Sequence, residues 1–489
     1  MKHQYELYTA QQTRELDRLA IETGGIAGFE LMQRAGRSVF NYLCQQWPEA
    51  RQLAIFCGSG NNAGDGYVVA HLAHRAGMAA HVYTLADPQQ LTGDARQAWQ
   101  LCVEDGIAIE AFVSGMHRDT DVVVDALLGT GVERELQGDW LTAVDCMNVS
   151  PWPVISIDIP SGIQADSGQV MGAAVRADVT VSFIGLNRGL FTGQAPEYTG
   201  RIEYDDLQLE DACYQEVVSE VSLIDEGVLG YLHPRSRVLH KGQCGHVLVI
   251  GGNRGMAGAP ILAARAALRT GAGLVSVATR AEHISSIVSA QPELMAHGVD
   301  DGASISSLLS RASVVVVGPG MGQDSWARTL LAQVLESRLP AVYDADALNL
   351  LAHEPSHCEN WVLTPHVGEA ARLLGRPADE IKSDRFMAVK QMQHQYGGIA
   401  VLKGAGSLIA SPDIKVCHHG NPGMATAGMG DFLAGVIAGL IAQGLSISHA
   451  AELGVWLHAR AGDMEAAEAG ERGMVATDLL ARIRQILND

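Results

Sequence analysis

One stretch of the chain is suited to phosphate chemistry: NPGMATAGMGDFLAGVIAGL, residues 421–440. Asp431 is its only charged residue, and its glycines include Gly423, Gly428, Gly430 and Gly435. Glycine loses the most conformational freedom on ordering, so such a run needs a reason. An apolar helical pattern follows, which would place the amides of 428–430 at a helix N-terminus, where N–H groups and the helix dipole attract anions. We expect the glycines to admit a phosphoryl group and Asp431 to take the proton of an attacking hydroxyl.

Two other segments of the same half support this interpretation. In AVLKGAGSLIAS, Lys403 stands at the end of an apolar strand pattern, and GPGMG (318–322) follows another such pattern. The alternative is that Asp431 is only a helix N-terminal charge, worth a few tenths to about 1 kcal/mol. Lys403 could likewise be a plain strand-end cation, and His366, in LTPHVGE, could simply cap a helix.

A second glycine-rich loop, CGSGNNAGDGYVVAHLAHRAG, lies between a strand and a helix near the start of the chain. Asp125 and Asp158 follow later strand patterns, in VVVDALLGTG and SIDIPSG. Because ligands gather at the carboxyl ends of parallel strands, these three segments should converge. Asn62, Asp125 and Ser161 would form an all-oxygen site for a hard cation, and Asp158 would remain free for proton transfer. The alternative is that these side chains only satisfy backbone groups in turns.

The elements that must position these residues alternate along the chain. Thr9 and Gln12 fit a capping box, so a helix should begin near residue 10, and a second helix should end before Pro48. Apolar runs at 53–58, 81–85, 121–129, 153–160 and 179–185 predict strands separated mostly by helices. A second such series begins near residue 245. This pattern predicts an α/β fold with parallel sheets in two domains, with a boundary near residue 220.

Composition excludes several classes of protein. The 489 residues carry a formal charge of −21, which argues against a nucleic-acid or anionic-membrane surface. The eight cysteines are scattered singly without a C-x-x-C pair, which favours reduced thiols and a cytoplasmic protein. The polar N-terminus does not fit a signal peptide, and the longest apolar run, 432–442, is shorter than the roughly 20 residues that span a bilayer.

The motifs GSGNNAGDG, DALLGTG and IDIPSG, in that order, resemble the NAD(P)H-hydrate epimerase domain, the YjeF N-terminal family, over roughly residues 1–215. The resemblance implies a Rossmann-like α/β/α sandwich, a potassium ion on Asn62, Asp125 and Ser161, and Asp158 as the catalytic residue against the substrate. It further implies substrate contacts from Asn61, Asn62, Ala63, Gly64 and Asp65, and from Gly129, Thr130, Gly131, Val132, Glu133, Arg134 and Glu135.

The motifs DADALN, LTPHVGE, LKG and NPGMATAGMGD resemble the ribokinase-like NAD(P)H-hydrate dehydratases, the YjeF C-terminal family, over roughly residues 225–489. The resemblance implies that Ala259, Gly322, His366 and Asp431 face the hydrated nucleotide, with Asp431 catalytic. It implies that ADP, with Mg²⁺, contacts Lys403, Gly404, Ala405, Gly406, Ser407 and Gly430. Many relatives have Ser or Thr where this chain has Met429, a change that a backbone anion site tolerates.

Together the two resemblances imply bifunctional repair of hydrated NADH and NADPH. Residues 1–220 would epimerise the R and S hydrates, and residues 221–489 would dehydrate the S form at the expense of ADP. The expected partners are these small molecules and further copies of the chain in a homo-oligomer, with no nucleic acid or membrane. Two alternatives are a ribokinase-like kinase for a vitamin precursor or sugar, and a non-catalytic nucleotide sensor.

Overall fold

The computed structural model describes residues 3–115 and 119–488, which form two compact units, Met1–Ser222 and Leu223–Asp489. The first unit contains strands β1 (Glu6–Tyr8), β2 (Gln52–Cys57), β3 (Ala79–Thr84), β4 (Ala108–Ala111), β5 (Val122–Ala126), β6 (Val154–Ile157), β7 (Val179–Phe183), β8 (Leu186–Asn187), β9 (Arg201–Asp205) and β10 (Val221–Leu223). Its helices are α1 (Ala10–Glu22), α2 (Gly28–Gln46), α3 (Asn61–Arg75), α4 (Gly93–Glu104), α5 (Asp139–Asn148) and α6 (Asp211–Glu216).

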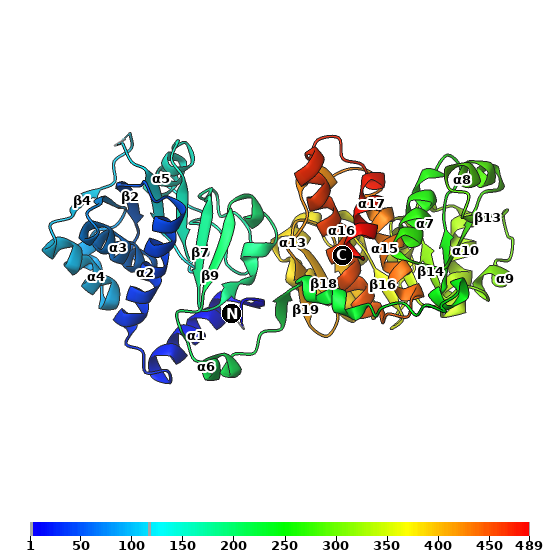
Figure 1. Cartoon of the computed structure of the whole chain (residues 1–489), viewed down its shortest axis with the longest axis horizontal. Coiled ribbons are helices and arrows are strands. Elements are labelled where there is room, and N and C mark those ends of the chain that lie inside the picture. The colour runs from blue at the N-terminus through cyan, green and yellow to red at the C-terminus, as the bar shows by residue number, and fades with distance from the viewer. Residues whose placement is uncertain (1–2, 116–118, 489) are drawn as a thin grey trace. The chain divides into compact units, whose positions relative to one another are not determined.

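The main sheet of the first unit is parallel throughout, with strand order β4-β3-β2-β5-β6-β7-β9. Alternate strand residues face opposite sides: Ile55 packs with helices α2 to α4, whereas Phe56 packs with α5. Figure 1 shows α2, α3 and α4 together on one side of these strands. The sheet is therefore covered on both faces, as the apolar strand patterns predict.

The second unit begins within β10 and has a longer sheet, whose strands are β11 (His246–Ile250), β12 (Leu274–Thr279), β13 (Met295–Gly298), β14 (Val314–Val317), β15 (Ala341–Tyr343), β16 (Trp361–Leu363), β17 (Ile399–Leu402), β18 (Ser407–Ala410) and β19 (Ile414–Cys417). Its helices are α7 (Gly258–Thr270), α8 (Ile284–Ala290), α9 (Ser306–Leu309), α10 (Ser325–Ser337), α11 (Asp346–His353), α12 (Val367–Leu374), α13 (Ala378–Ser383), α14 (Arg385–Tyr396), α15 (Met429–Ala442), α16 (Ile447–Ala469) and α17 (Leu479–Ile486).

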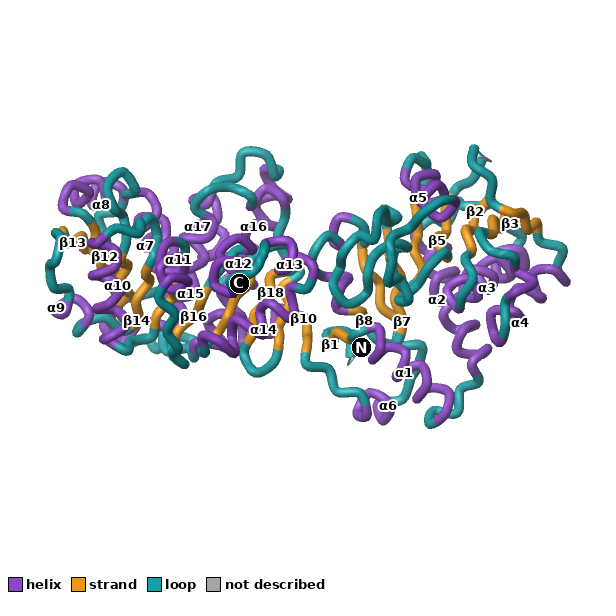
Figure 2. The backbone as a smooth tube through the Cα atoms, turned by 180° about the vertical axis from the view of Figure 1, so that it is seen from behind, coloured by secondary structure: helices purple, strands orange, loops and turns teal. Residues whose placement is uncertain are grey.

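Strands β13-β12-β11-β14-β15-β16-β17 of this sheet are parallel, and β18 and β19 continue it with antiparallel pairing. One face packs on α7, α15, α16 and α17 in a single apolar core. Figure 2, seen from behind, shows α10, α11 and α14 beside the strands on the other side. The predicted mixture of parallel strands and covering helices is confirmed for both units.

Local signals at the start of the chain are also confirmed. The Thr9 side chain accepts a hydrogen bond from Gln12 N, and Gln12 bonds back to Thr9 N, so α1 begins with a capping box. Helix α2 ends at Gln46, before Pro48, as expected. Among the described residues, no helix combines the length and apolar character needed to cross a bilayer.

Helices α7 and α15 approach closely because of glycine. A Cβ atom on Gly435 would lie 2.0 Å from the carbonyl oxygen of Ala263, and one on Gly439 would lie 2.9 Å from that of Ala267. These contacts are with backbone, which cannot move aside cheaply. The interpretation that the glycines of this stretch admit phosphate is therefore wrong for Gly435, which serves helix packing.

We predict that Gly435→Ala destabilises the protein by about 1–3 kcal/mol or more, because the added methyl group overpacks this interface. Urea unfolding followed by circular dichroism would measure the change. Gly230→Ala is a matched control, since nothing lies within 4 Å of a Cβ atom there. Equal stability of the two variants would contradict this account of the α7–α15 contact.

Two candidate active sites

Asp158 follows β6 in an unusual backbone conformation. Its φ angle of 66° lies in the left-handed region, where non-glycine residues are uncommon. Its amide donates to the carbonyl oxygen of Val181 at 2.7 Å, and Ser182 Oγ donates to its Oδ1 at 3.4 Å. Burial raises the pKa of Asp158 to about 6, which the hydrogen bond from Ser182 opposes. A carboxyl group with this pKa can both give and take a proton near neutrality.

Asn62 lies beside Asp158, in the first turn of α3. A Cβ atom on Gly129 would be 3.4 Å from Asp158 Oδ2 and 3.6 Å from Asn62 Cγ, so three predicted segments meet here. Both polar atoms of the buried Asn62 amide lack a hydrogen-bond partner. Because buried polar groups are normally paired, this amide marks a position for a ligand.

Asp125 and Ser161 are joined directly. Asp125 is fully buried, and it accepts hydrogen bonds from Ser161 Oγ at 2.6 Å, Ser161 N at 2.9 Å and Ser156 Oγ at 2.8 Å. Burial raises the pKa of Asp125, and these bonds oppose the rise. Ser161 Oγ also accepts from Leu128 N at 2.9 Å, one residue before Gly129. The pair thus ties the ends of β5 and β6 to the loop that carries Gly129.

The residues present fit a potassium ion. Asn62, Asp125 and Ser161 supply only oxygen ligands, which suit a hard cation. The Asn62 Oδ1 atom has no hydrogen-bond partner within the described chain.

Asp17 is an acidic residue that the sequence analysis missed. The surrounding protein atoms and the charge of Asp158 raise the pKa of Asp17 to about 7, although its side chain keeps solvent-exposed surface. Burial and the charges of Asp158 and Asp17 also raise the pKa of Asp65. The spacing gave a weak signal, because Asp17 lies four residues after buried Thr13 and three before buried Ala20, at the border between the buried and exposed faces of α1.

The remaining residues predicted for this site differ in accessibility. Asn61 is exposed, whereas Ala63 and Gly64 are buried. After β5, Thr130 is half-buried, Val132 is buried, and the other predicted residues are exposed: Gly131, Glu133, Arg134 and Glu135. The Val132 side chain therefore belongs to the core, and only its backbone could meet a ligand.

In the second unit, α15 begins at Met429, two residues earlier than expected. Gly428 caps it with a φ angle of 89°, which favours glycine. The first N–H groups of a helix have no intrahelical partner, so the amides of Met429, Gly430 and Asp431 are donors for an anion. Burial and the charge of Asp344 raise the pKa of Asp431 to about 7, which Lys403 opposes. A base and an anion site therefore share one helix end.

Lys403 lies against this helix end. Its Nζ donates to Asp344 Oδ1 at 2.7 Å and lies 3.9 Å from Glu369 Oε2. A Cβ atom on Gly430 would be 3.1 Å from the same Nζ atom, so the glycine makes room for the ammonium group. Of the predicted nucleotide-binding loop, Lys403 and Ser407 are partly accessible, Gly404 and Ala405 are exposed, and Gly406 is buried.

His366 caps α12, the alternative raised for it above. Its Nδ1 accepts from Gly368 N at 2.9 Å and from Glu369 N at 3.3 Å. Burial and the charge of Lys403 lower the pKa of His366, so the ring is neutral with its proton on Nε2. The side chain is 56% exposed. The cap leaves Nε2 as the donor, 3.5 Å from Glu369 Oε1, so a ligand would compete with that carboxylate for its proton.

Ala259 and Gly322 come together through the loop after β14. A Cβ atom on Gly320 would lie 3.2 Å from Ala259 Cβ, and Gly322 N donates to Asp346 Oδ2 at 2.7 Å. Asp346 is the first residue of α11 and one of the acids whose charge reaches Asp431. Ala259, Gly322 and His366 thus follow the carboxyl ends of the parallel strands β11, β14 and β16, and Asp431 comes from the first turn of α15.

Asp344 and Glu369 are the residues that sequence reasoning missed in this unit. Both are buried, and both flank the ammonium group of Lys403. The signal lay in YDADALN and LTPHVGE, each of which places an acid at a strand-to-helix junction. Sequence alone did not indicate which of these acids pairs with Lys403.

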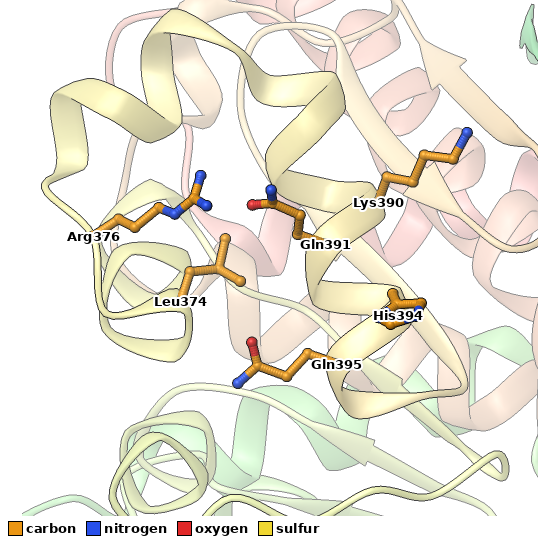
Figure 3. A pocket seen from close by; sticks show the side chains of 6 residues that line it. All are labelled: Leu374, Arg376, Lys390, Gln391, His394 and Gln395. Atoms are coloured by element: carbon orange, nitrogen blue, oxygen red, sulfur yellow. The ribbon is translucent and has the colours of Figure 1, made fainter.

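A separate recess of about 380 Å³ lies between the end of α12 and helix α14. Figure 3 shows the Leu374 and Arg376 side chains facing Gln391 and Gln395 across it. It contains none of the residues predicted for either reaction, so we place neither reaction there.

Comparison with known proteins agrees with the two units. The family model of YjeF-related protein N-termini matches residues 28–189, and that of the NAD(P)H-hydrate dehydratases matches residues 247–485. A bifunctional NAD(P)H-hydrate repair enzyme of Coxiella burnetii is 48% identical over 485 residues, 99% of each chain. This chain belongs to the family of bifunctional NAD(P)H-hydrate repair enzymes. The family member of Escherichia coli K12 is 41% identical over 99% of this chain and 94% of its own.

Solved structures agree with the fold of the second unit. A ribokinase-like superfamily protein of Enterococcus faecalis is 29% identical and gives a TM-score of 0.52, covering 55% of this chain and 96% of its own. A hypothetical protein of Streptococcus mutans is 33% identical, with a TM-score of 0.51, over 54% of this chain and 98% of its own. The ribokinase-like fold and the family resemblance expected from the motifs are confirmed.

Proposed function

We propose that this chain repairs hydrated NADH and NADPH in two steps. Residues 1–220 interconvert the R and S hydrates, and residues 221–489 dehydrate the S hydrate while ADP is converted to AMP and phosphate. The proposal rests mainly on Asp431, whose pKa is near neutrality and which lies in the first turn of α15. The Lys403 ammonium group lies against the same turn, beside Gly430. Membership of the bifunctional repair family supports the same conclusion.

In the dehydration, Asp431 takes the proton of the hydroxyl group on C6 of the hydrated ring. The oxygen forms a bond to the β-phosphorus of ADP, and AMP leaves with the electron pair of the broken bond. The amides of 429–431 and the ammonium group of Lys403 stabilise the transferring charge. The C–O bond then breaks as the ring nitrogen donates its electron pair, phosphate departs, and loss of a proton from C5 restores NADH.

The ligand contacts follow from this chemistry. ADP would lie along Lys403, Gly404, Ala405, Gly406, Ser407 and Gly430. The hydrated ring would lie near Ala259, Gly322 and His366, where the neutral imidazole can donate from Nε2. In the described part of the chain no three acids, histidines or cysteines could cage a metal, so Mg²⁺ would be held mainly by nucleotide phosphates, whose charge it would offset.

In the epimerisation, Asp158 takes the proton of the C6 hydroxyl group as the C6–N bond breaks, so that the oxygen becomes an aldehyde carbonyl and the ring nitrogen keeps the electron pair. The nitrogen then adds back to the other face of the carbonyl carbon, and Asp158 returns the proton to the oxygen. The substrate would contact the loop of Asn61 to Asp65 and the loop of Gly129 to Glu135. Asn62, Asp125 and Ser161 would hold potassium, whose charge would fix these loops. Cytoplasmic location and a homo-oligomeric state stay predictions from the sequence.

The pH dependence of dehydration follows from Asp431. The charged side chains around it are Asp344, Asp346, Glu369 and Lys403, and the three acids raise its pKa against Lys403. The base must be ionised to accept a proton, so kcat/KM for the S hydrate should fall about tenfold per pH unit below about pH 7 and level off above it. Initial rates from about pH 5.5 to pH 8.5, corrected for decay of the hydrate without enzyme, measure the profile. A flat profile would exclude Asp431 as the base.

The function itself is tested with a mixture of R and S NADH hydrates, with and without ADP. We expect recovery of the reduced-nicotinamide absorbance only with ADP, together with free phosphate and AMP in equal amounts. A ribokinase-like kinase would instead give a stable phosphate ester, and a nucleotide sensor would give neither product. Product analysis by chromatography separates the three outcomes.

A further inference from the structure

Asp344 is fixed at the end of β15 in the centre of the second sheet. Its side chain is 2% exposed, and its amide donates to the carbonyl oxygen of Val317 at 3.1 Å. Its Oδ1 accepts from Thr364 Oγ1 at 2.9 Å and from Lys403 Nζ at 2.7 Å. A carboxylate held by two strands and a hydroxyl group is a rigid anchor for the ammonium group.

Lys403 depends on this anchor. Burial alone would lower the pKa of Lys403, but the charges of Asp344 and Glu369 raise it above its ordinary value, so the ammonium group stays charged. Glu369 is the more distant acid, at 3.9 Å, and it also accepts from the amide of His366 at 2.8 Å. An ammonium group has three donors. One of them is used by Asp344, and Glu369 is too distant for a hydrogen bond, so the ammonium group can still donate to a ligand anion.

The Lys403 ammonium group lies at the N-terminus of α15, whose partial positive charge disfavours a cation. The Lys403 Nζ atom lies 3.1 Å and Asp344 Oδ2 lies 3.3 Å from the position of a Cβ atom on Gly430. Both groups therefore touch the first turn of α15, whose N-terminus carries a partial positive charge. Asp344 supplies the negative charge that keeps a cation at this end of the helix before a phosphoryl group arrives.

We propose that Asp344 is a positioning residue of the dehydration: it acts through Lys403, holding the ammonium group at the α15 N-terminus for the transferring phosphoryl group. This rests on the function proposed above for the same site. Without Asp344, Lys403 keeps only the longer contact to Glu369 and loses its fixed position. The negative charge next to Asp431 is lost at the same time.

The test is a double-mutant cycle in the full chain with Asp344→Asn, Lys403→Met and the double variant. Each single variant should lower kcat for dehydration about 10–100-fold and raise the ADP concentration at half-saturation. If Asp344 acts through Lys403, the double variant should lose little more than Lys403→Met alone. Removing the charge of Asp344 should also move the inflection of kcat/KM to lower pH, which a purely structural role would not do.

Three controls keep this test decisive. The epimerisation rate and the melting temperature report whether each variant is folded. Asp379→Asn removes an exposed acid that pairs with Lys382 at 3.1 Å, and this variant should keep the wild-type dehydration kinetics. If Asp344→Asn does not fold, Thr364→Val, which removes the hydroxyl bonds to Asp344 and to the carbonyl oxygen of Tyr343, should shift the same parameters less. Calorimetric titration with Mg²⁺ and ADP gives the same cycle without turnover.

The outcomes separate this inference from the proposed function. Failure of the wild-type chain to dehydrate NADH hydrate contradicts the function, and nucleotide binding then still reports the coupling of Asp344 to Lys403. Additive losses in the double variant, an unmoved pH inflection, or unchanged kinetics of a folded Asp344→Asn variant overturn the inference alone.

Discussion

Asp431→Asn is expected to abolish dehydration of the S hydrate, with a loss of about 10²–10⁴-fold in kcat, and to leave epimerisation unchanged. Asparagine has nearly the same shape but cannot accept a proton, so the hydroxyl group of the hydrate is not activated. The side chain is near the first turn of α15, and a neutral group there removes at most about 1 kcal/mol of helix-dipole interaction. Stability should therefore change little while the reaction stops.

The measurement is the rate of NADH recovery from the S hydrate with ADP, beside the rate of R-to-S conversion in the same preparation. Asp379→Asn serves again as the matched acid-to-amide control in the same unit. Retention of more than about a tenth of the dehydration rate would show that another group removes the proton.

Asp158→Asn should have the converse effect: R-to-S conversion falls about 10²–10⁴-fold, and dehydration of the pure S hydrate continues. Asparagine is the right substitution here because residue 158 has a φ angle of 66°, a conformation that Asn tolerates better than most residues. Asp158→Ala would confuse a chemical effect with backbone strain. The amide also keeps an acceptor for Ser182.

Chromatography that resolves the two epimers gives the rate directly. Ser182→Ala is a useful comparison, because it removes only the 3.4 Å hydrogen bond to Asp158 and should cost much less than the loss of the acid. A folded Asp158→Asn variant that still epimerises at the wild-type rate would show that another group carries the proton. Asp17 and Asp65, which interact with the charge of Asp158, are then the acidic candidates.

The sequence predicted the positions of the sites because topology decides them. Loops at the carboxyl ends of parallel strands must gather at one edge, so Asn62, Asp125, Asp158 and Ser161 could be grouped without coordinates. The structure joins Asp125 to Ser161 and brings Asn62 next to Asp158. The start of α15 was predicted within two residues for a similar reason, since a glycine run followed by an apolar pattern defines a helix start.

Pairs between distant elements could not be predicted in this way. Asp344 and Lys403 are 59 residues apart, and their 2.7 Å contact depends on the register of β15, β16 and β17. Asp17 belongs to a helix with no motif, and only packing brings it into the range of Asp158. Gly435 shows the opposite error, because a residue type suited to phosphate binding is used instead for close contact with Ala263.

The most direct test of the two-site account mixes the two catalytic variants with pure R hydrate of NADH and ADP. Neither Asp158→Asn nor Asp431→Asn alone should restore NADH, because each lacks one of the two steps. Together they should restore it, since the Asp431→Asn protein makes the S hydrate and the Asp158→Asn protein dehydrates it. No recovery from the mixture, with both variants folded and each active in its remaining step, would contradict the account.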